Sequence, residues 1–194
     1  SMADWQVEDQ TYLEKHLPAD RGFFYIIRDK IQLPDSCKKV FTIPLWQMVM
    51  QQHMPFTVKD ATIQALDHTH IPAMIGLTAL TRPGPFSQRT IEFGNYIGIF
   101  EQDQLVAMAG ERLKVPGFTE VSAICTHPDA TGKGYGAALL SAACSRILEK
   151  GEIPFLHVRN DNLRAINMYE KAGFAIRCEM DFAIFKKTAP LSEQ

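Results

Sequence analysis

The fold of this 194-residue chain is decided by residues 122–137, which read SAICTHPDATGKGYGA. This stretch begins as the end of a β-strand, continues as a glycine-rich loop at residues 131–136, and enters a helix with apolar residues at helical spacing. Free N–H groups and the positive dipole end of a helix's first turn attract phosphate, and glycines let the backbone approach it closely. The stretch therefore predicts an anion-binding loop, although a glycine turn without a ligand also fits the glycines alone.

Two familiar nucleotide-binding loops fit this stretch less well. A Walker loop needs Gly-Lys followed by Ser or Thr, whereas Lys133 is followed by Gly134. The Rossmann fingerprint needs two residues before its last glycine, whereas only Tyr135 separates Gly134 from Gly136. The pattern favours neither ATP nor NAD.

Working outward from the loop, the pattern predicts strands and helices of a mixed α/β sheet. Three antiparallel strands precede the loop helix, and a strand, a second helix and one or two strands follow it. In chain order the expected elements are a short strand near Thr62, a helix near Asp67–Leu80, a loop at Thr81–Pro85, strands at Tyr96–Phe100, Leu105–Val115 and Thr119–Thr126, a helix at Gly136–Lys150 ended by Gly151, a strand at Pro154–Arg159, a helix at Asn162–Ala172 ended by Gly173, and strands in Phe174–Lys186. The earlier residues give mixed signals: Phe23–Ile27 is β-rich, and Val40–Met50 is apolar but interrupted by Pro44.

The composition is that of an ordinary folded chain. Apolar residues make up 46% and charged residues 22%, far from the low-hydrophobicity, high-charge composition of disordered proteins. The net charge of -2 offers no global attraction to nucleic acid or anionic lipid. The four cysteines lack zinc-ligand spacing, and no apolar run approaches the roughly 20 residues of a membrane span. We expect free thiols, no metal, no nucleic-acid or membrane partner, and a cytoplasmic location.

Two motifs follow the loop at a characteristic spacing: Asn162-Leu163-Arg164-Ala165-Ile166-Asn167-Met168-Tyr169 and Gly173-Phe174. With the loop Thr131-Gly132-Lys133-Gly134-Tyr135-Gly136, they resemble the GNAT superfamily of acyl-CoA N-acyltransferases. That family carries Gln/Arg-x-x-Gly-x-Gly/Ala, then Asn-x-x-Ala-x-x-x-Tyr, then Gly-Phe. The resemblance covers about Thr62 to Lys187. It implies a mostly antiparallel central sheet flanked by helices and splayed between its fourth and fifth strands, where acyl-CoA inserts.

The domain division follows from the resemblance. Residues 62–187 are expected to form the acyltransferase domain, preceded by an extension of residues 1–61 packed on it and followed by a tail of residues 188–194. Thr131 departs from the family pattern, because it stands where Gln or Arg is usual. Either the Thr131 hydroxyl or Lys133 replaces the lost pyrophosphate contact, or the affinity for CoA is lower.

The resemblance also implies which residues hold acetyl-CoA. Backbone amides of the loop and of the helix start should face the pyrophosphate, and the strand edge at Ile124 and Thr126 should bond the pantetheine arm as peptides bond a sheet edge. The expected cofactor-binding residues are Ile124, Cys125, Thr126, Thr131, Gly132, Lys133, Gly134, Tyr135, Gly136, Ala137 and Asn162. Alternation places the Cys125 side chain on the other face, in the core, and Asn162 also fits a helix N-cap.

Acyl transfer from a thioester to an amine needs a proton donor for the thiolate and a base for the amine. Tyr169 matches the family tyrosine that protonates the sulfur, and Glu120 resembles the glutamate that some members use as a base through water. A hairpin turning at Pro116-Gly117 would place Glu111 across from Ser122 and diagonal to Glu120, and two like charges raise at least one pKa. The competing interpretation is that both glutamates are simply exposed at the end of a strand.

Other ionisable residues have ordinary interpretations. His127, next to Pro128, is an alternative base but fits a turn cap, and His157 inside an apolar strand is expected to pack or bond backbone. Arg82 and Arg89 near the 81–86 loop are candidates for an acceptor carboxylate. Candidate substrate-binding residues are therefore Arg82, Phe86 and Glu111.

The sequence thus predicts an N-acetyltransferase that moves an acetyl or short acyl group from acetyl-CoA to a primary amine of a small molecule or peptide. The attack is direct, without a covalent enzyme intermediate. The chain is expected to be a monomer or homodimer. The alternative is a CoA-binding sensor or interaction module with little catalysis.

Overall fold

The computed structural model of the chain describes residues 15–16, 22–28, 36–59 and 61–187. These residues divide into two compact units. One unit contains Ser1–Trp46, Arg159–Asp161 and Cys178–Gln194, and the other contains Gln47–Val158 and Asn162–Arg177. The predicted tail of residues 188–194 lies outside the described residues, and the boundary predicted at residue 61 stays a prediction.

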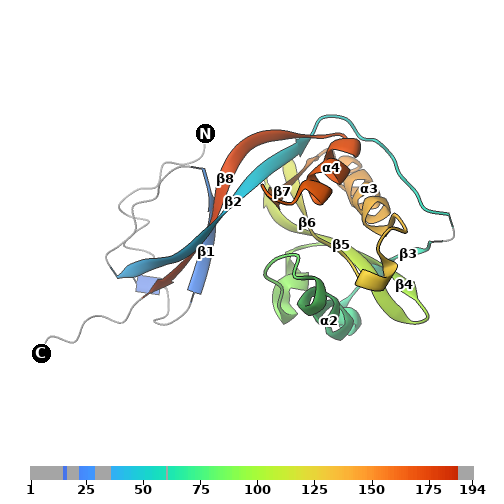
Figure 1. The fold of residues 1–194 in the computed structure, drawn as a ribbon, viewed down its shortest axis with the longest axis horizontal. Coiled ribbons are helices and arrows are strands. Elements are labelled where there is room, and N and C mark those ends of the chain that lie inside the picture. Colours follow the sequence, from blue (N-terminus) through green and yellow to red (C-terminus); the bar gives the residue numbers. More distant parts are fainter. Residues whose placement is uncertain (1–14, 17–21, 29–35, 60, 188–194) are drawn as a thin grey trace, which may run out of the picture. The chain divides into compact units, whose positions relative to one another are not determined.

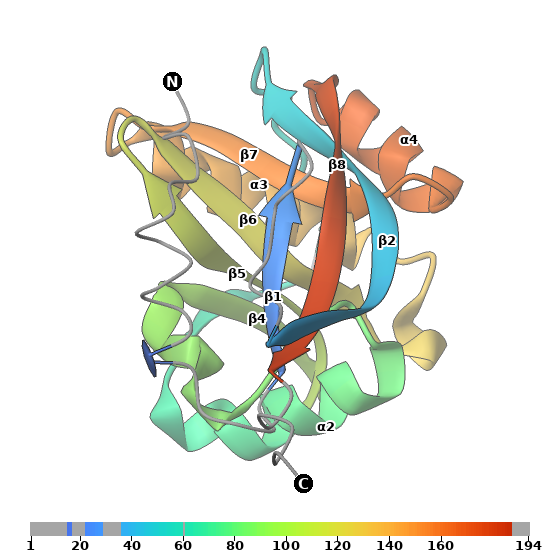
Figure 2. The ribbon, with the colours of Figure 1, turned by 90° about the vertical axis from the view of Figure 1, so that its left-hand side faces the viewer.

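The smaller unit is a β-ribbon, in which β1 (Gly22–Ile27) pairs antiparallel with the second half of β8 (Phe174–Lys187). Figure 2 shows β1, β8 and β2 (Cys37–Met50) side by side in this unit. Phe23 stacks on Phe185 at 5.6 Å between ring centroids, so large aromatic side chains hold this sheet. The strand expected at Phe23–Ile27 is confirmed, and Pro44 does not end β2.

The larger unit is built on a mixed sheet with the strand order β7-β6-β5-β4-β3. The strands are β3 (Ile63–Leu66), β4 (Tyr96–Glu101), β5 (Gln104–Val115), β6 (Phe118–Thr126) and β7 (Ile153–Arg159). β3 to β6 pair antiparallel in succession, whereas β6 and β7 are parallel. The predicted mixed and mostly antiparallel sheet is confirmed.

Helices lie on both sides of this sheet, with α2 (Ile71–Thr81) on one side and α3 (Tyr135–Leu148) and α4 (Leu163–Lys171) on the other (Figure 1). Short 3-10 turns at His68–His70, Gln88–Phe93 and Pro128–Ala130 complete the unit. The helix predicted from Asp67 therefore starts as a 3-10 turn capped by Asp67. In the described part of the chain, no helix is both long enough and apolar enough to cross a bilayer.

The core of the larger unit fills both sides of the central strands. Met74 and Leu77 of α2 pack with Met108 of β5 and Cys125 of β6. On α3, Leu140, Cys144 and Ile147 have no exposed surface, as the i, i+4, i+7 spacing predicts. Cys125 is a core side chain, as its alternation predicts, and burial raises the pKa of its thiol to about 11.

The strands β6 and β7 separate soon after they begin. Their register runs from Phe118 opposite Ile153 to Glu120 opposite Phe155, whereas β6 continues to Thr126. These are the fourth and fifth strands of the predicted acyltransferase sheet. The splay predicted between them is confirmed, and Glu120 is the last paired residue before it opens.

Candidate functional site

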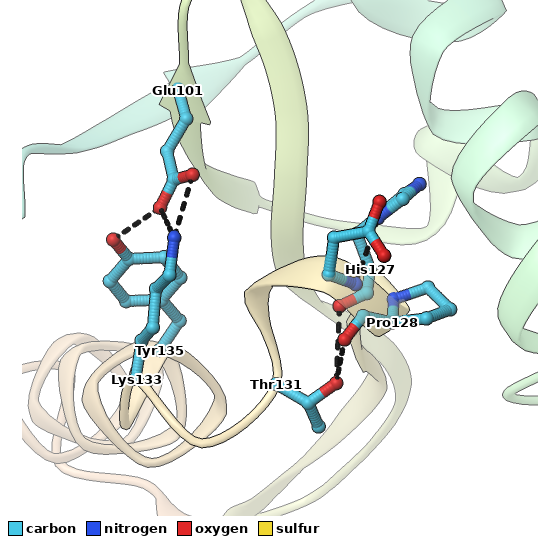
Figure 3. Close-up of polar contacts among 7 residues, drawn as sticks. Glu101, His127, Pro128, Thr131, Lys133 and Tyr135 are labelled. Atoms are coloured by element: carbon cyan, nitrogen blue, oxygen red, sulfur yellow. Dashed lines mark hydrogen bonds and ion pairs between the residues drawn. The ribbon is translucent and has the colours of Figure 1, made fainter.

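The end of β6 leads into a tight turn that stiffens the predicted loop. His127 caps the 3-10 turn, since its Nδ1 accepts a hydrogen bond from the Asp129 N–H at 3.3 Å. The Thr131 hydroxyl donates to the carbonyl oxygens of Pro128 and His127 (Figure 3). Thr131 is therefore engaged within its own turn, and His127 has the capping role that was one of its two interpretations.

The loop itself presents backbone N–H groups at the start of α3. Gly132 and Gly134 have φ of +88° and +81°, a left-handed conformation that glycine adopts without strain. Gly134 is the N-cap, and it has no side chain to cap the helix. The first backbone bond of the helix is from Ala138 N–H to the Gly134 carbonyl, at 3.0 Å. The N–H groups of residues 135–137 therefore lie at an uncapped N-terminus, which fits a pyrophosphate.

Three elements meet beside this helix start. A Cβ placed on Gly136 would lie 3.5 Å from the Thr126 hydroxyl, 3.7 Å from the Met168 sulfur and 4.0 Å from an Ile124 methyl group. Strand β6, the loop helix and α4 therefore converge on one glycine. Since β7 no longer pairs with β6 here, the β6 edge carries backbone groups that a pantetheine amide chain can bond.

Lys133 lies at the outer side of the loop, in a three-residue cluster with Glu101 and Tyr135 (Figure 3). The Lys133 ammonium contacts both Glu101 carboxylate oxygens at 2.7 and 2.9 Å, and the Tyr135 hydroxyl donates to Glu101 at 2.6 Å. These bonds lower the pKa of Glu101. Lys133 therefore forms an ion pair with Glu101, which partly neutralises the charge of its ammonium.

The second predicted motif lies on α4. Asn162 is the N-cap of this helix, and its side chain accepts from the Ala165 N–H at 3.2 Å. Tyr169 is 8% exposed, and its ring lies 6.3 Å from that of Phe174. Burial raises the pKa of Tyr169, which keeps the phenol protonated at neutral pH. A protonated, buried phenol is suited to donating a proton.

Glu120 is fully buried at the point where β6 and β7 part. Arg112 donates to both carboxylate oxygens, at 2.6 and 2.8 Å, and His157 Nδ1 lies 2.7 Å from Oε1. Burial alone would raise the pKa of Glu120, but the hydrogen bonds from Arg112 and His157 outweigh it, and the pKa is lowered. The raised pKa expected for a carboxylate pair at this position is wrong.

The polar network continues beyond Glu120. His157 is 4% exposed, and its Nε2 lies 3.1 Å from the Gln47 amide nitrogen. Arg177 in turn donates to the Gln47 side-chain oxygen. With Nδ1 donating to Glu120, the neutral imidazole accepts at Nε2. His157 packs, as expected, edge-on to Phe155 at 5.7 Å, but its ring nitrogens bond two buried polar side chains and not backbone.

Glu111 lies in a separate cluster. Its carboxylate bonds Asn95 at 3.0 Å, Lys114 at 2.9 Å and Lys150 at 3.2 Å. Burial raises its pKa, but the bonds from these partners outweigh burial and lower it from 4.5 to about 2. Glu111 therefore stays ionised as a structural anchor between β5 and α3.

The predicted facing of Glu111 and Ser122 is wrong by one residue. From the hairpin turn, Val115 pairs with Phe118 and Lys114 with Thr119, but Glu111 pairs with Val121 and Gly110 with Ser122. A bulge between Glu111 and Lys114 causes this shift. It brings Arg112 level with Glu120, so the glutamate meets an arginine rather than a second glutamate.

The candidate acceptor residues have different surroundings. Arg82 is exposed at the end of α2, Phe86 is half-buried and edge-on to Tyr96 at 5.9 Å, and the Arg89 guanidinium pairs with Glu92 at 2.8 Å.

A hollow of about 460 Å³ lies between α2 and the β4–β5 turn. Its lining, which includes Leu77, Leu80, Gln102–Leu105 and His127, contains no residue of α4 or β7. It is separate from the helix start at Gly136.

Arg112, Glu101 and Gln47 are the polar site residues that sequence reasoning missed. The opposite charges of Arg112 and Glu120 on the two strands of one hairpin were a visible signal, because buried charges are paired. Glu101 and Gln47 lie 32 and 110 positions from their partners and left no local signal. Within the described residues, no three His, Cys, Asp or Glu side chains gather as a metal site.

Comparison with known proteins agrees with this geometry. The family model described as FR47-like protein matches residues 96–183. Mycothiol acetyltransferase of Corynebacterium aurimucosum is 40% identical over 62 residues, 31% of this chain and 20% of that protein, and the Propionibacterium freudenreichii enzyme of the same name is 43% identical over 58 residues, 29% and 19%. The matched segment thus spans about a fifth of these relatives.

Solved structures resemble the chain over a longer range. A structure from Novosphingobium aromaticivorans assigned to the GNAT family of acetyltransferases has a TM-score of 0.83 and 29% identity, over 93% of this chain and 80% of that one. The ribosomal-protein-S18-alanine N-acetyltransferase of Escherichia coli has a TM-score of 0.55 and 22% identity, over 69% of this chain and 98% of that one. The second likeness concerns the fold alone.

Proposed function

The chain contains a GNAT N-acetyltransferase domain, and on this premise we propose that it moves an acetyl group from acetyl-CoA to a primary amine by direct attack. The single observation that carries this proposal is the position of an uncapped, glycine-rich helix start beside a strand edge that has just parted from its parallel neighbour. The first feature attracts a pyrophosphate and the second accepts an amide chain. Acetyl-CoA has both in one molecule.

Tyr169 is proposed as the general acid. When the amine nitrogen attacks the thioester carbon, the carbon–sulfur bond breaks and the departing thiolate needs a proton. The buried phenol of Tyr169, held in its protonated form, donates that proton and recovers it from solvent. The support is its burial on α4, whose Met168 sulfur lies 3.7 Å from the position of a Cβ on Gly136.

Glu120 is proposed as the base, acting together with His157. Its lowered pKa makes the carboxylate alone a weak proton acceptor, but a carboxylate bonded to Nδ1 orients an imidazole and stabilises the imidazolium that forms at Nε2. Gln47 must release Nε2 for this transfer. The proton lost by the amine then rests on His157, beside the charge of Glu120.

The acceptor is proposed to be a primary amine of a small molecule or peptide, with the exposed Arg82 receiving a carboxylate if the acceptor carries one. Phe86 packs on the core beside it and contributes an apolar wall. Two relatives carry mycothiol in their names, so an acceptor panel should include mycothiol-related amines beside amino acids and peptides.

Two measurements test this function in sequence. Acetyl-CoA at 100 times its Kd should stabilise the protein by roughly 2.7 kcal/mol, seen as a thermal shift. Release of CoA thiol across the amine panel then distinguishes an enzyme from a sensor that only binds. Glu120→Gln should depress the low-pH side of the rate profile, and an unchanged profile would remove Glu120 from the base role.

A further inference from the structure

The segment between β2 and β3 passes the outside of the proposed cofactor site. Residues 51–59, here called the strap, run from the end of β2 past α4 and α3 toward β3 (Figure 1). The N–H groups of Gln51 and Gln52 donate to the Gly173 carbonyl at 2.9 and 3.3 Å. A Cβ on Gly173 would lie 1.7 Å from the Gln52 oxygen, so only glycine lets the strap pass here.

Further bonds hold the strap on α3. The Phe56 N–H donates to the Ser141 hydroxyl at 3.0 Å, and His53 Nε2 lies 3.5 Å from the Ser145 hydroxyl. Both partners lie on one face of the helix, four residues apart. The backbone of the strap is therefore fixed without using the Phe56 ring.

The Phe56 ring lies against the phosphate loop. A Cβ on Gly134, the N-cap of α3, would lie 3.2 Å from the edge of this ring and 3.1 Å from a Val58 methyl group. Phe56 nevertheless remains 46% exposed. Phe56 is therefore held beside the loop with 46% of its surface open to a ligand bound there.

We propose that Phe56 is the contact for the adenosine of CoA, and that the strap makes the site selective for CoA over donors that carry the pantetheine arm without a nucleoside. The proposal rests on the proposed function, because it starts from a pyrophosphate at Gly132–Gly136. In CoA the adenosine is bonded directly to that pyrophosphate, so it must lie next to the loop. Stacking on an aromatic ring is the ordinary means of holding a base.

The other aromatic ring at the loop is already engaged. Tyr135 donates to Glu101, and the Lys133 ammonium lies 5.8 Å from its ring centroid. Phe56 is on the strap side, without such a charged neighbour over its ring among the contacts of the described residues. The adenosine is therefore assigned to the strap side of the loop.

The test compares two ligands by calorimetry: CoA, and 4′-phosphopantetheine, which lacks adenosine. Phe56→Ala should weaken CoA binding by about tenfold and leave 4′-phosphopantetheine binding unchanged. Phe56→Trp should restore CoA binding. Met54→Ala is the matched control, because Met54 lies on the same strap with the same 46% exposure, and it should change neither ligand.

Other outcomes overturn the proposal in distinguishable ways. Equal weakening of both ligands by Phe56→Ala would mean that the ring only supports the loop through Gly134. No weakening of either would mean that the adenosine lies elsewhere. If the unaltered protein binds neither ligand, the proposed function itself fails and this inference fails with it.

Discussion

The phosphate loop and the buried Glu120 cluster use polar groups in opposite ways. In the loop, backbone N–H groups at the start of α3 are the proposed ligand contacts, and the side chains of Lys133 and Glu101 pair at the surface. At Glu120, a fully buried carboxylate is bonded by Arg112 and His157. Backbone sites depend on a short local sequence, whereas a buried charge depends on partners brought by register and topology. The loop should therefore tolerate side-chain changes that the buried cluster cannot.

The largest expected effect is on the buried cluster. Arg112→Met leaves the Glu120 carboxylate buried without its main partner, which costs about 3–5 kcal/mol of unfolding free energy. Denaturant unfolding measures this loss. Arg89→Met is the control, because its exposed pair with Glu92 is screened by water and should contribute little to stability. Similar losses in both variants would contradict the distinction between buried and surface charge pairs.

Tyr169→Phe tests the proposed general acid. Removing the hydroxyl should slow turnover by about 10²-fold, the usual effect of losing a general acid, while acetyl-CoA affinity stays unchanged. Thiol-release kinetics and calorimetry give the two values separately. Turnover close to that of the unaltered protein would exclude Tyr169 as the proton donor.

The stability of the protein in acid tests the second buried carboxylate, Glu111. Its pKa falls from 4.5 to about 2 in the folded protein, so the stabilisation it provides is complete above about pH 4.5 and is lost as the pH falls toward 2. Glu111→Gln lacks this titration. Unfolding free energy measured from pH 6 to 2 should decline more steeply for the unaltered protein than for the variant, and parallel declines would show that the ion pairs with Lys114 and Lys150 contribute little.

The smallest expected effect belongs to the loop. Lys133→Ala should weaken acetyl-CoA binding by about fivefold or less, since the lysine is exposed, its charge is already shared with Glu101, and backbone groups carry the pyrophosphate. Lys171→Ala, at the far end of α4, is the control for net charge. A loss of about a hundredfold, or 2.7 kcal/mol, would mean that the lysine and not the backbone holds the phosphate.

The loop, α3 and α4 could be predicted from sequence because their determinants are local. Gly132 and Gly134 set the loop conformation, the apolar spacing of residues 140–147 sets the buried face of α3, and Asn162 caps α4. The strands were found for the same reason. Family resemblance added the splay that follows Glu120.

The environment of Glu120 could not be predicted, because it depends on one bulged residue. Counting back from the Pro116-Gly117 turn without a bulge places Glu111 opposite Ser122, whereas the bulge places it opposite Val121 and brings Arg112 to Glu120. That single shift changes the partner of the glutamate from a like charge to an opposite one. The strap over Gly134 was equally hidden, since its contacts join residues about 80 positions apart.

The central claim is that acetyl-CoA binds at the loop and helix start of residues 132–137, and a calorimetric titration of two proteins tests it most directly. Gly136 has ordinary helical backbone, and an added Cβ would already contact Thr126 and Met168 at 3.5 and 3.7 Å, so the larger side chain of Gly136→Leu must displace these neighbours and block the space between β6 and α4. Denaturant unfolding of the variant checks that it still folds. The account predicts saturable one-to-one binding of acetyl-CoA to the unaltered protein and loss of that binding in Gly136→Leu. Equal binding to both proteins, or to neither, would contradict it.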